Sequence, residues 1–142
     1  MPCSLLFVPP YDADTRLVDR LTGRHGYGHV AIWGGQTSEG EPVVFDAGIG
    51  YGVGFRPLSV ACGKLFRELR LTDPLGEWIW SRALAHVGGG YDYAGLVRSR
   101  AQTTRFTCSG LVASCMPAHM RAELPGRCSP NDIARYFGVP AW

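Results

Sequence analysis

The first half of the chain alternates short apolar runs with polar turns, a pattern typical of β-strands. Each run is rich in β-branched and aromatic residues and is closed by Gly, Pro or polar residues. The polar turn "QTSEGEP" separates two of the runs and predicts that they pair as a hairpin. One stretch, residues 12–23, instead has acidic residues at its start and a glycine at its end, as a helix does. The predicted strands cover residues 4–10, 28–35, 43–48, 52–59 and 64–72.

The second half of the chain carries the start and stop signals of helices. Residues 73–88 predict a helix with Asp73 as N-cap and Pro74 in its first turn. A further helix begins at Thr107 or Cys108 and stops before Pro117, and residues 129–138 form a third, with a Ser cap and a Pro start. Residues 91–99 read as a short helix or a loop. Strands first and helices afterwards favour the α+β class with an antiparallel sheet.

Composition narrows the classes of function. A chain of 142 residues with 46% hydrophobic residues predicts a single globular domain over residues 1–142. A net charge of +2 is too small to indicate a nucleic-acid partner, and no apolar stretch is long enough for a membrane span. The N-terminus lacks the basic region of a signal peptide. We therefore expect synthesis in the cytoplasm without a signal peptide, followed by retention there or by export in a phage particle or through a lysis pore.

Five cysteines are present, at irregular spacing and without a C-x-x-C pair. This pattern predicts neither a disulfide framework nor a structural zinc site, and no cofactor is expected.

Cys108 opens the segment "CSGLVASCM" and is the first candidate for a reactive side chain. A cysteine in the first turn of a helix lies among unpaired N–H groups at the positive end of the helix dipole, which stabilise a thiolate. The same N–H groups can hold an oxyanion during acyl transfer. Leu111, Val112 and Cys115 follow at helical spacing and predict the buried face of this helix. The alternative interpretation is that Cys108 is an inert thiol in that core.

His29 is the best candidate for a base that activates this thiol. It begins the strand "HVAIW", in which alternation places His29 and the other odd-numbered residues on one face. Asp46, on the next strand of the hairpin, can orient the imidazole through its second nitrogen. Glu41 is the alternative orienting acid, but it stands in the turn. We expect His29 and Asp46 on one face of the sheet, with the N-terminus of the Cys108 helix packed against that face. The alternative for the histidine is a satisfied structural residue.

Several segments resemble the NlpC-type cell-wall peptidases, which are papain-like cysteine enzymes. "TCSGLV" resembles the catalytic-cysteine helix of that family, "GGGYDYAGL" the segment before it, and "CSPNDIARYF" the family's Ser-Pro-x-Asp-Leu helix. The cysteine precedes the histidine in most of the family, whereas here His29 precedes Cys108. That order is similar to the circularly permuted branch, which includes the lecithin:retinol acyltransferase-like proteins. "LVDRLTGRHGYGHVAIW" and "VVFDAG" resemble its N-terminal segments, so the resemblance spans roughly residues 4–137.

The resemblance implies a permuted papain-like fold, in which an antiparallel sheet packs against the helix of the catalytic cysteine. It also implies that Cys108 is the nucleophile and His29 the base. Asp46 would orient the base, at a position where the family more often has His, Asn, Gln or Glu. Tyr91 and the backbone N–H of Cys108 would stabilise the reaction intermediate.

Ser109 and His25 are two further candidates for lining a substrate site. Ser109 adjoins the expected nucleophile, and His25 lies in the glycine-rich loop "GRHGYGH" before the expected base. The alternatives are a hydrogen bond within the helix turn for Ser109 and a solvated loop histidine for His25.

The function that the resemblance implies is a cysteine hydrolase that cleaves an amide bond, with peptidoglycan stem peptides as the expected substrate. An acyltransferase or thioesterase acting on lipid-like acyl groups is the alternative from the same fold. A non-catalytic structural module of a phage-like particle is the alternative from another class. The expected partners are the amide substrate and a phage tail or secretion machine that delivers the protein to the periplasm or cell wall.

Overall fold

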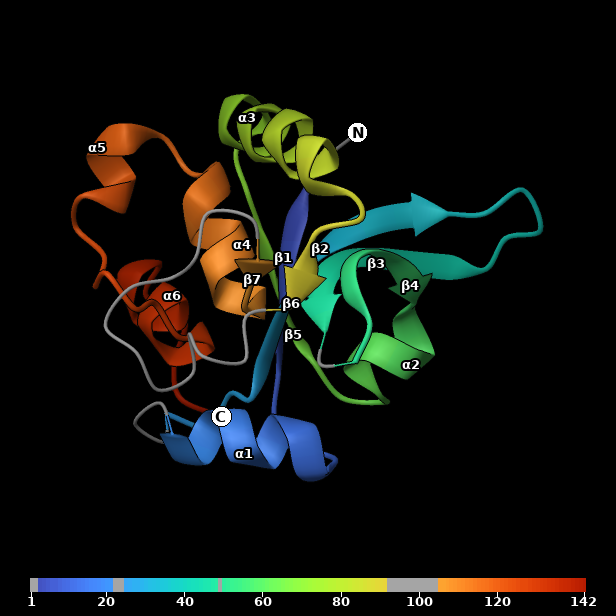
Figure 1. Ribbon diagram of the computed structural model, residues 1–142, viewed down its shortest axis with the longest axis horizontal. Coiled ribbons are helices and arrows are strands. Elements are labelled where there is room, and N and C mark those ends of the chain that lie inside the picture. The colour runs from blue at the N-terminus through green and yellow to red at the C-terminus, as the bar shows by residue number, and fades with distance from the viewer. Residues whose placement is uncertain (1–2, 22–24, 49, 92–104) are drawn as a thin grey trace.

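A five-stranded antiparallel sheet forms the centre of the molecule (Figure 1). The computed structural model describes residues 3–21, 25–48, 50–91 and 105–142. The spatial order of the strands is β4-β3-β2-β1-β5, and all four neighbouring pairs are antiparallel. The α+β class with an antiparallel sheet is therefore confirmed, whereas a single domain over residues 1–142 stays a prediction. The strands are β1 (Ser4–Val8), β2 (His29–Gln36), β3 (Pro42–Gly48), β4 (Gly52–Pro57) and β5 (Arg67–Arg70).

Helices surround this sheet, and the long ones match the predicted segments. A second, two-stranded sheet is parallel and joins β6 (Gly90–Tyr91) to β7 (Arg105–Phe106). The sequence did not predict α2, α5 or this small sheet, because elements this short show no periodicity. Most of the expected short helix or loop at residues 91–99 lies outside the described residues. The helices are α1 (Ala13–Leu21), α2 (Leu58–Cys62), α3 (Asp73–Ala83), the 3-10 turn η1 (Leu84–His86), α4 (Cys108–Cys115), α5 (Ala118–Arg121) and α6 (Pro130–Tyr136).

Side-chain caps fix the starts of the two helices that matter most for the site. The Thr107 hydroxyl accepts a hydrogen bond from the N–H of Gly110 at 2.9 Å, so α4 begins at Cys108. At α6, Ser129 and Asp132 form a reciprocal capping box. Both starts agree with the sequence prediction.

The predicted N-cap of α3 is wrong by one residue. Thr72, not Asp73, holds the cap position, because its backbone is extended and its carbonyl accepts the first helical hydrogen bond, from Gly76. Asp73 lies inside the first turn, where the helix dipole favours its negative charge.

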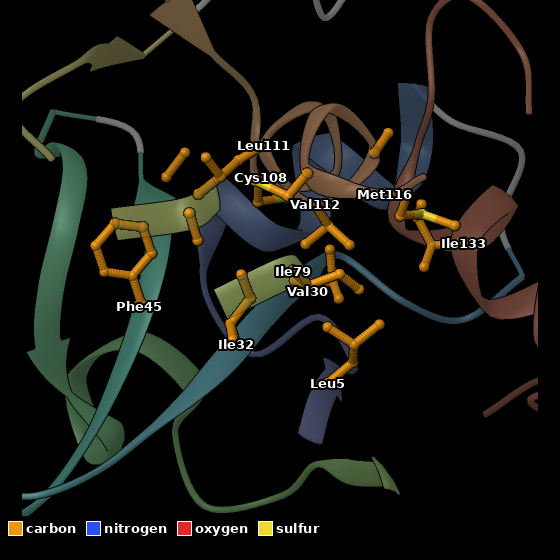
Figure 2. Close-up of a cluster of buried hydrophobic side chains, with 14 of the residues drawn as sticks. Leu5, Val30, Ile32, Phe45, Ile79, Cys108, Leu111, Val112, Met116 and Ile133 are labelled. Carbon is orange, nitrogen blue, oxygen red and sulfur yellow. The ribbon is translucent and has the colours of Figure 1, made fainter. Parts of the chain in front are cut away.

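The two faces of the sheet carry separate apolar cores. On one face, side chains such as Val30, Ile32 and Phe45 pack with α3, α4 and α6 (Figure 2). On the other face, Ala31 and Val44 pack with α2. Neighbouring residues of one strand thus enter different cores, which is the alternation expected of a sheet covered on both sides.

Candidate active site

Cys108 is the first residue of α4 and lies in the larger core, near Leu111 and Val112 (Figure 2). The predicted stripe of Leu111, Val112 and Cys115 is buried, so the helix faces the sheet as its sequence indicates. Cys108 itself is only 2% exposed. The residue therefore occupies both of the places considered for it, since it stands at a helix N-terminus and within the core.

His29 and Asp46 are in direct contact. Nε2 of His29 lies 2.6 Å from Oδ2 of Asp46, and both side chains are buried. Burial alone opposes the charge of the carboxylate. The hydrogen bonds and positive charges of His29 and Arg56 outweigh that effect and lower the pKa of Asp46. Because an ionised carboxylate only accepts hydrogen bonds, Nε2 of His29 carries the proton and donates it to Asp46.

The imidazole of His29 also interacts with the Cys108 side chain, whose charge and hydrogen bonding act on its pKa. Since Asp46 occupies Nε2, Nδ1 is the ring nitrogen left for the sulfur. Burial disfavours the protonated ring, but the charge of Cys108 and the hydrogen bonds to Asp46 and Cys108 outweigh it. Together they raise the pKa of His29 from 6.5 to about 10. The structure thus assembles a Cys–His–Asp chain of contacts from α4, β2 and β3.

The prediction that the Cys108 helix packs against the sheet face that carries Asp46 is wrong. Asp46 shares the α2 face of the sheet with Val44, its neighbour two positions along β3, whereas α4 packs on the opposite face. The contact is possible because His29 is the first residue of β2, paired with the last residue of β1. At that end of the sheet, the imidazole of His29 can contact both Asp46 on the α2 face and Cys108 on the α4 face.

A cavity of about 200 Å³ opens beside His29 on the α2 side. Tyr91, the last residue of β6, contributes to its wall, and its contact with the thiol stays a prediction. The cavity reaches the imidazole, and Cys108 is not one of the described residues that line it. Its lining comprises Tyr11, Asp12, Thr15, Gly28, His29, Ala47, Gly48, Arg56, Val60, Ala61 and Tyr91.

Three of the other sequence candidates lie apart from this cavity. Glu41 is exposed at the β2–β3 turn, so Asp46 is the acid that contacts His29. The ring Nε2 of His25 lies 3.4 Å from the carbonyl oxygen of Val139, which places His25 against the C-terminal segment. The hydroxyl of Ser109 donates to the carbonyl of Cys128 at 2.5 Å and joins α4 to the segment before α6. Substrate contact by Ser109 or His25 stays a prediction.

Arg56 is a partner of the site that the sequence interpretation missed. Its Nε donates to Oδ1 of Asp46 at 2.9 Å, and one terminal nitrogen bonds Oδ2. The signal was present, since Arg56 is a charged residue inside a predicted strand that follows the strand of Asp46. Without the register of β3 against β4, however, its face could not be assigned.

Within the described residues, no group of three or more His, Cys, Asp or Glu side chains is placed to hold a metal ion. In the same part of the chain, no helix has the length and apolar character needed to cross a membrane. Comparison with protein-family models and with curated proteins gives no match for this sequence.

Proposed function

We propose that this protein is a cysteine hydrolase that cleaves an amide bond through a thiolate nucleophile. The single observation that carries the proposal is the buried chain of contacts from Asp46 through His29 to Cys108, at the first residue of a helix. This is the order of orienter, base and nucleophile that acyl-transfer enzymes require. The resemblance of "TCSGLV" and its neighbours to NlpC-type peptidases supports peptidoglycan stem peptides as the substrate and a permuted papain-like fold.

The resting state of the proposed site is an ion pair. With the pKa of His29 near 10, the imidazole is protonated at neutral pH, so that both Nδ1 and Nε2 carry a proton. Asp46 holds Nε2–H and balances the positive charge of the ring. In this proposal the Cys108 sulfur attacks as a thiolate, with the imidazolium beside it.

In the first half of the reaction, the Cys108 sulfur attacks the carbonyl carbon of the amide and a C–S bond forms. The backbone N–H of Cys108 donates to the developing oxyanion, because the first N–H groups of a helix have no partner within it. Nδ1–H of His29 then protonates the amine, the C–N bond breaks, and a thioester with Cys108 remains.

In the second half, the neutral His29 takes a proton from a water molecule, which attacks the thioester carbonyl. The C–S bond breaks, the carboxylic acid product leaves, and the thiolate and imidazolium are restored. We infer that Tyr91, which lines the cavity beside His29, donates to the intermediate. Delivery of the protein to the cell wall by a phage tail or secretion machine belongs to this proposal as well.

A second candidate, an acyltransferase or thioesterase for lipid-like acyl groups, is favoured by one observation. A mostly apolar cavity of about 570 Å³ lies beside Tyr11, which also lines the cavity at His29. Pro9, Pro10, Leu65 and Trp142 contribute to its wall. The first chemical step would be the same, and only the acyl group and its acceptor would differ.

The test is a measurement of intact mass after incubation with muropeptides and, separately, with long-chain acyl thioesters. The amidase proposal expects shortened muropeptides and a transient acyl adduct on Cys108. Cys108→Ala should lose both, while Cys115→Ala, which removes a buried thiol from the same helix, should keep both. Glu41→Gln should behave as wild type.

Each outcome selects one interpretation. Turnover of the thioesters alone would replace the amidase by the acyl-transfer candidate. A folded wild-type protein that neither turns over nor forms an adduct with any of these compounds would favour the non-catalytic module.

A further inference from the structure

Asp46 is held by two cations at once, and the second of them has no place in a simple Cys–His–Asp chain. His29 Nε2 and a terminal nitrogen of Arg56 both contact Oδ2, while Nε of Arg56 bonds Oδ1 at 2.9 Å. The carboxylate therefore accepts on both oxygens, and the two donors from Arg56 fix the plane in which it lies. A planar guanidinium fork provides this geometry, which a lysine cannot.

The residues around Arg56 pack closely against its guanidinium. A Cβ at Gly48 would lie 2.8 Å from Cζ of Arg56, so a larger residue at this position would push the guanidinium away from its present place. The ring of Tyr51 lies with its centroid 5.1 Å from Cζ. The Arg56 side chain is 15% exposed. These contacts hold the guanidinium against the carboxylate rather than in solvent.

We propose that Arg56 is a positioning residue of this site: it locks both oxygens of Asp46, so that the carboxylate holds Nε2–H of His29 and the ring presents Nδ1 to Cys108. An Asp–Arg pair between neighbouring strands is by itself a structural feature. Here the same oxygen that binds Arg56 also binds His29, so any rotation of the carboxylate turns the imidazole. The kinetic part of this proposal rests on the proposed function, whereas its effect on the imidazole does not.

Arg56 also sets the charge balance around the imidazole. Its positive charge competes with that of His29 for one carboxylate, so its removal leaves the whole negative charge of Asp46 to the ring. Among the residues that the structure describes, the other titratable groups that face these side chains are Tyr11 and Asp12 from the segment after β1, Cys62 from α2, Tyr91 from β6 and Cys108 from α4.

Two of these groups stay neutral in the pH range of interest. Burial, and then the nearby negative charge, raise the pKa values of Tyr11 and Cys62 to about 12. Asp12 is held locally, since its Oδ1 accepts from the hydroxyl and the N–H of Thr15.

The deciding experiment reads the imidazole of His29 directly, by ¹⁵N chemical shifts across a pH titration. It is carried out in Cys108→Ala protein, because loss of the Cys108 charge brings the imidazole into a range where its neutral form can be observed. With Arg56 present, the neutral ring should be the Nε2–H tautomer. Arg56→Met should mix the tautomers and raise the proton affinity of His29 by about tenfold, the effect of one charged hydrogen-bond partner. Arg56→Lys should restore the proton affinity of His29, because it keeps the positive charge. It should not restore the single Nε2–H tautomer, because lysine lacks the planar fork of donors.

The matched control is Arg67→Met on β5, at the far edge of the sheet, which should leave both readings unchanged. In active protein, Arg56→Met should lower kcat by about tenfold or more, with KM little changed. Where Arg56→Met does not fold, Arg56→Lys carries the test, because it keeps the positive charge beside Asp46; it should fold and keep the proton affinity of His29 while still showing mixed tautomers.

Two results separate the proposals. If Arg56→Met alters the tautomers of His29 but neither wild type nor any variant shows activity, the role of Arg56 stands and the proposed function is overturned. An imidazole in Arg56→Met with the tautomer and proton affinity of the parent, accompanied only by lower stability, would overturn the role of Arg56.

Discussion

Selective alkylation of Cys108 is the sharpest test of the thiolate, because burial makes the other four cysteines harder to ionise and therefore slower to react. Burial raises the pKa of Cys3 and Cys115 to about 11 and that of Cys62 to about 12, and it raises the pKa of Cys128 as well. At pH 6.5, a thiol with a pKa of 11 is ionised in about one molecule in thirty thousand, against about one in a hundred for an ordinary thiol.

The ionised fractions of the two kinds of thiol differ by about 300-fold, and this difference sets the expected ratio of their alkylation rates. A more basic thiolate is also the stronger nucleophile. A difference of about 2.5 pKa units makes each ionised buried thiol roughly 13-fold more reactive than an ordinary thiolate. The net disadvantage of the buried thiols is therefore about twentyfold. Cys108 has the imidazolium of His29 beside it, so we expect it to react with iodoacetamide at least twentyfold faster than any other cysteine.

The assay is alkylation with a limiting amount of iodoacetamide near pH 6.5, followed by digestion and mass spectrometry to locate the label. Exposure gives the opposite order, since Cys3 and Cys128 are 7% and 8% exposed and Cys108 is 2% exposed. Labelling of Cys3 and Cys128 first would show that access controls the reaction and would refute the thiolate argument. His29→Ala should remove the preference for Cys108.

Three further outcomes are expected. Cys108→Ala and His29→Ala should each lower kcat by at least about a thousandfold, whereas Asp46→Asn should leave measurable turnover, because an orienting residue is partly replaceable. Although burial opposes the charged ring, the net rise in the pKa of His29 from 6.5 to about 10 makes its stabilisation complete below about pH 6.5 and lost as the pH rises through about 10. Urea titrations across that range should show a smaller loss in Cys108→Ala, whose thiolate is one of the groups that raise this pKa, and an equal loss would contradict the ion pair. Gly28→Ala should lower the free energy of unfolding by about 1–3 kcal/mol, because its Cβ would lie 2.1 Å from a backbone oxygen of α1, while Gly54→Ala, whose nearest contact is 3.4 Å, should change it far less.

Much of the fold could be predicted because its signals are local. Alternation in "HVAIW" and "VVFDAG" identified β2 and β3, and the polar turn between them identified their pairing. Thr107 and Ser129 marked helix starts through hydrogen bonds that span only three residues. The small elements escaped, since β6 and β7 are held by pairing with each other across a long stretch of sequence.

The candidate site divides in the same way. Cys108 was found from its position at a helix start, and His29 and Asp46 from their places on paired strands. Arg56 was missed because its contact with Asp46 depends on the register of β3 with β4, where Val44 lies opposite Arg56 and Asp46 opposite Gly54. Register is a property of two strands together, and a single strand does not specify it.

The sequence by itself determined the longer strands and helices, the buried face of α4, and three candidates for the chemistry, which are Cys108, His29 and Asp46. Only the tertiary structure decided that α4 and Asp46 lie on opposite faces of the sheet and meet through His29 at the end of β2. The physical reason is the range of the interactions. Periodicity and capping act within a few residues along the chain, whereas the meeting of Asp46, Arg56, His29 and Cys108 requires four elements to be packed at once.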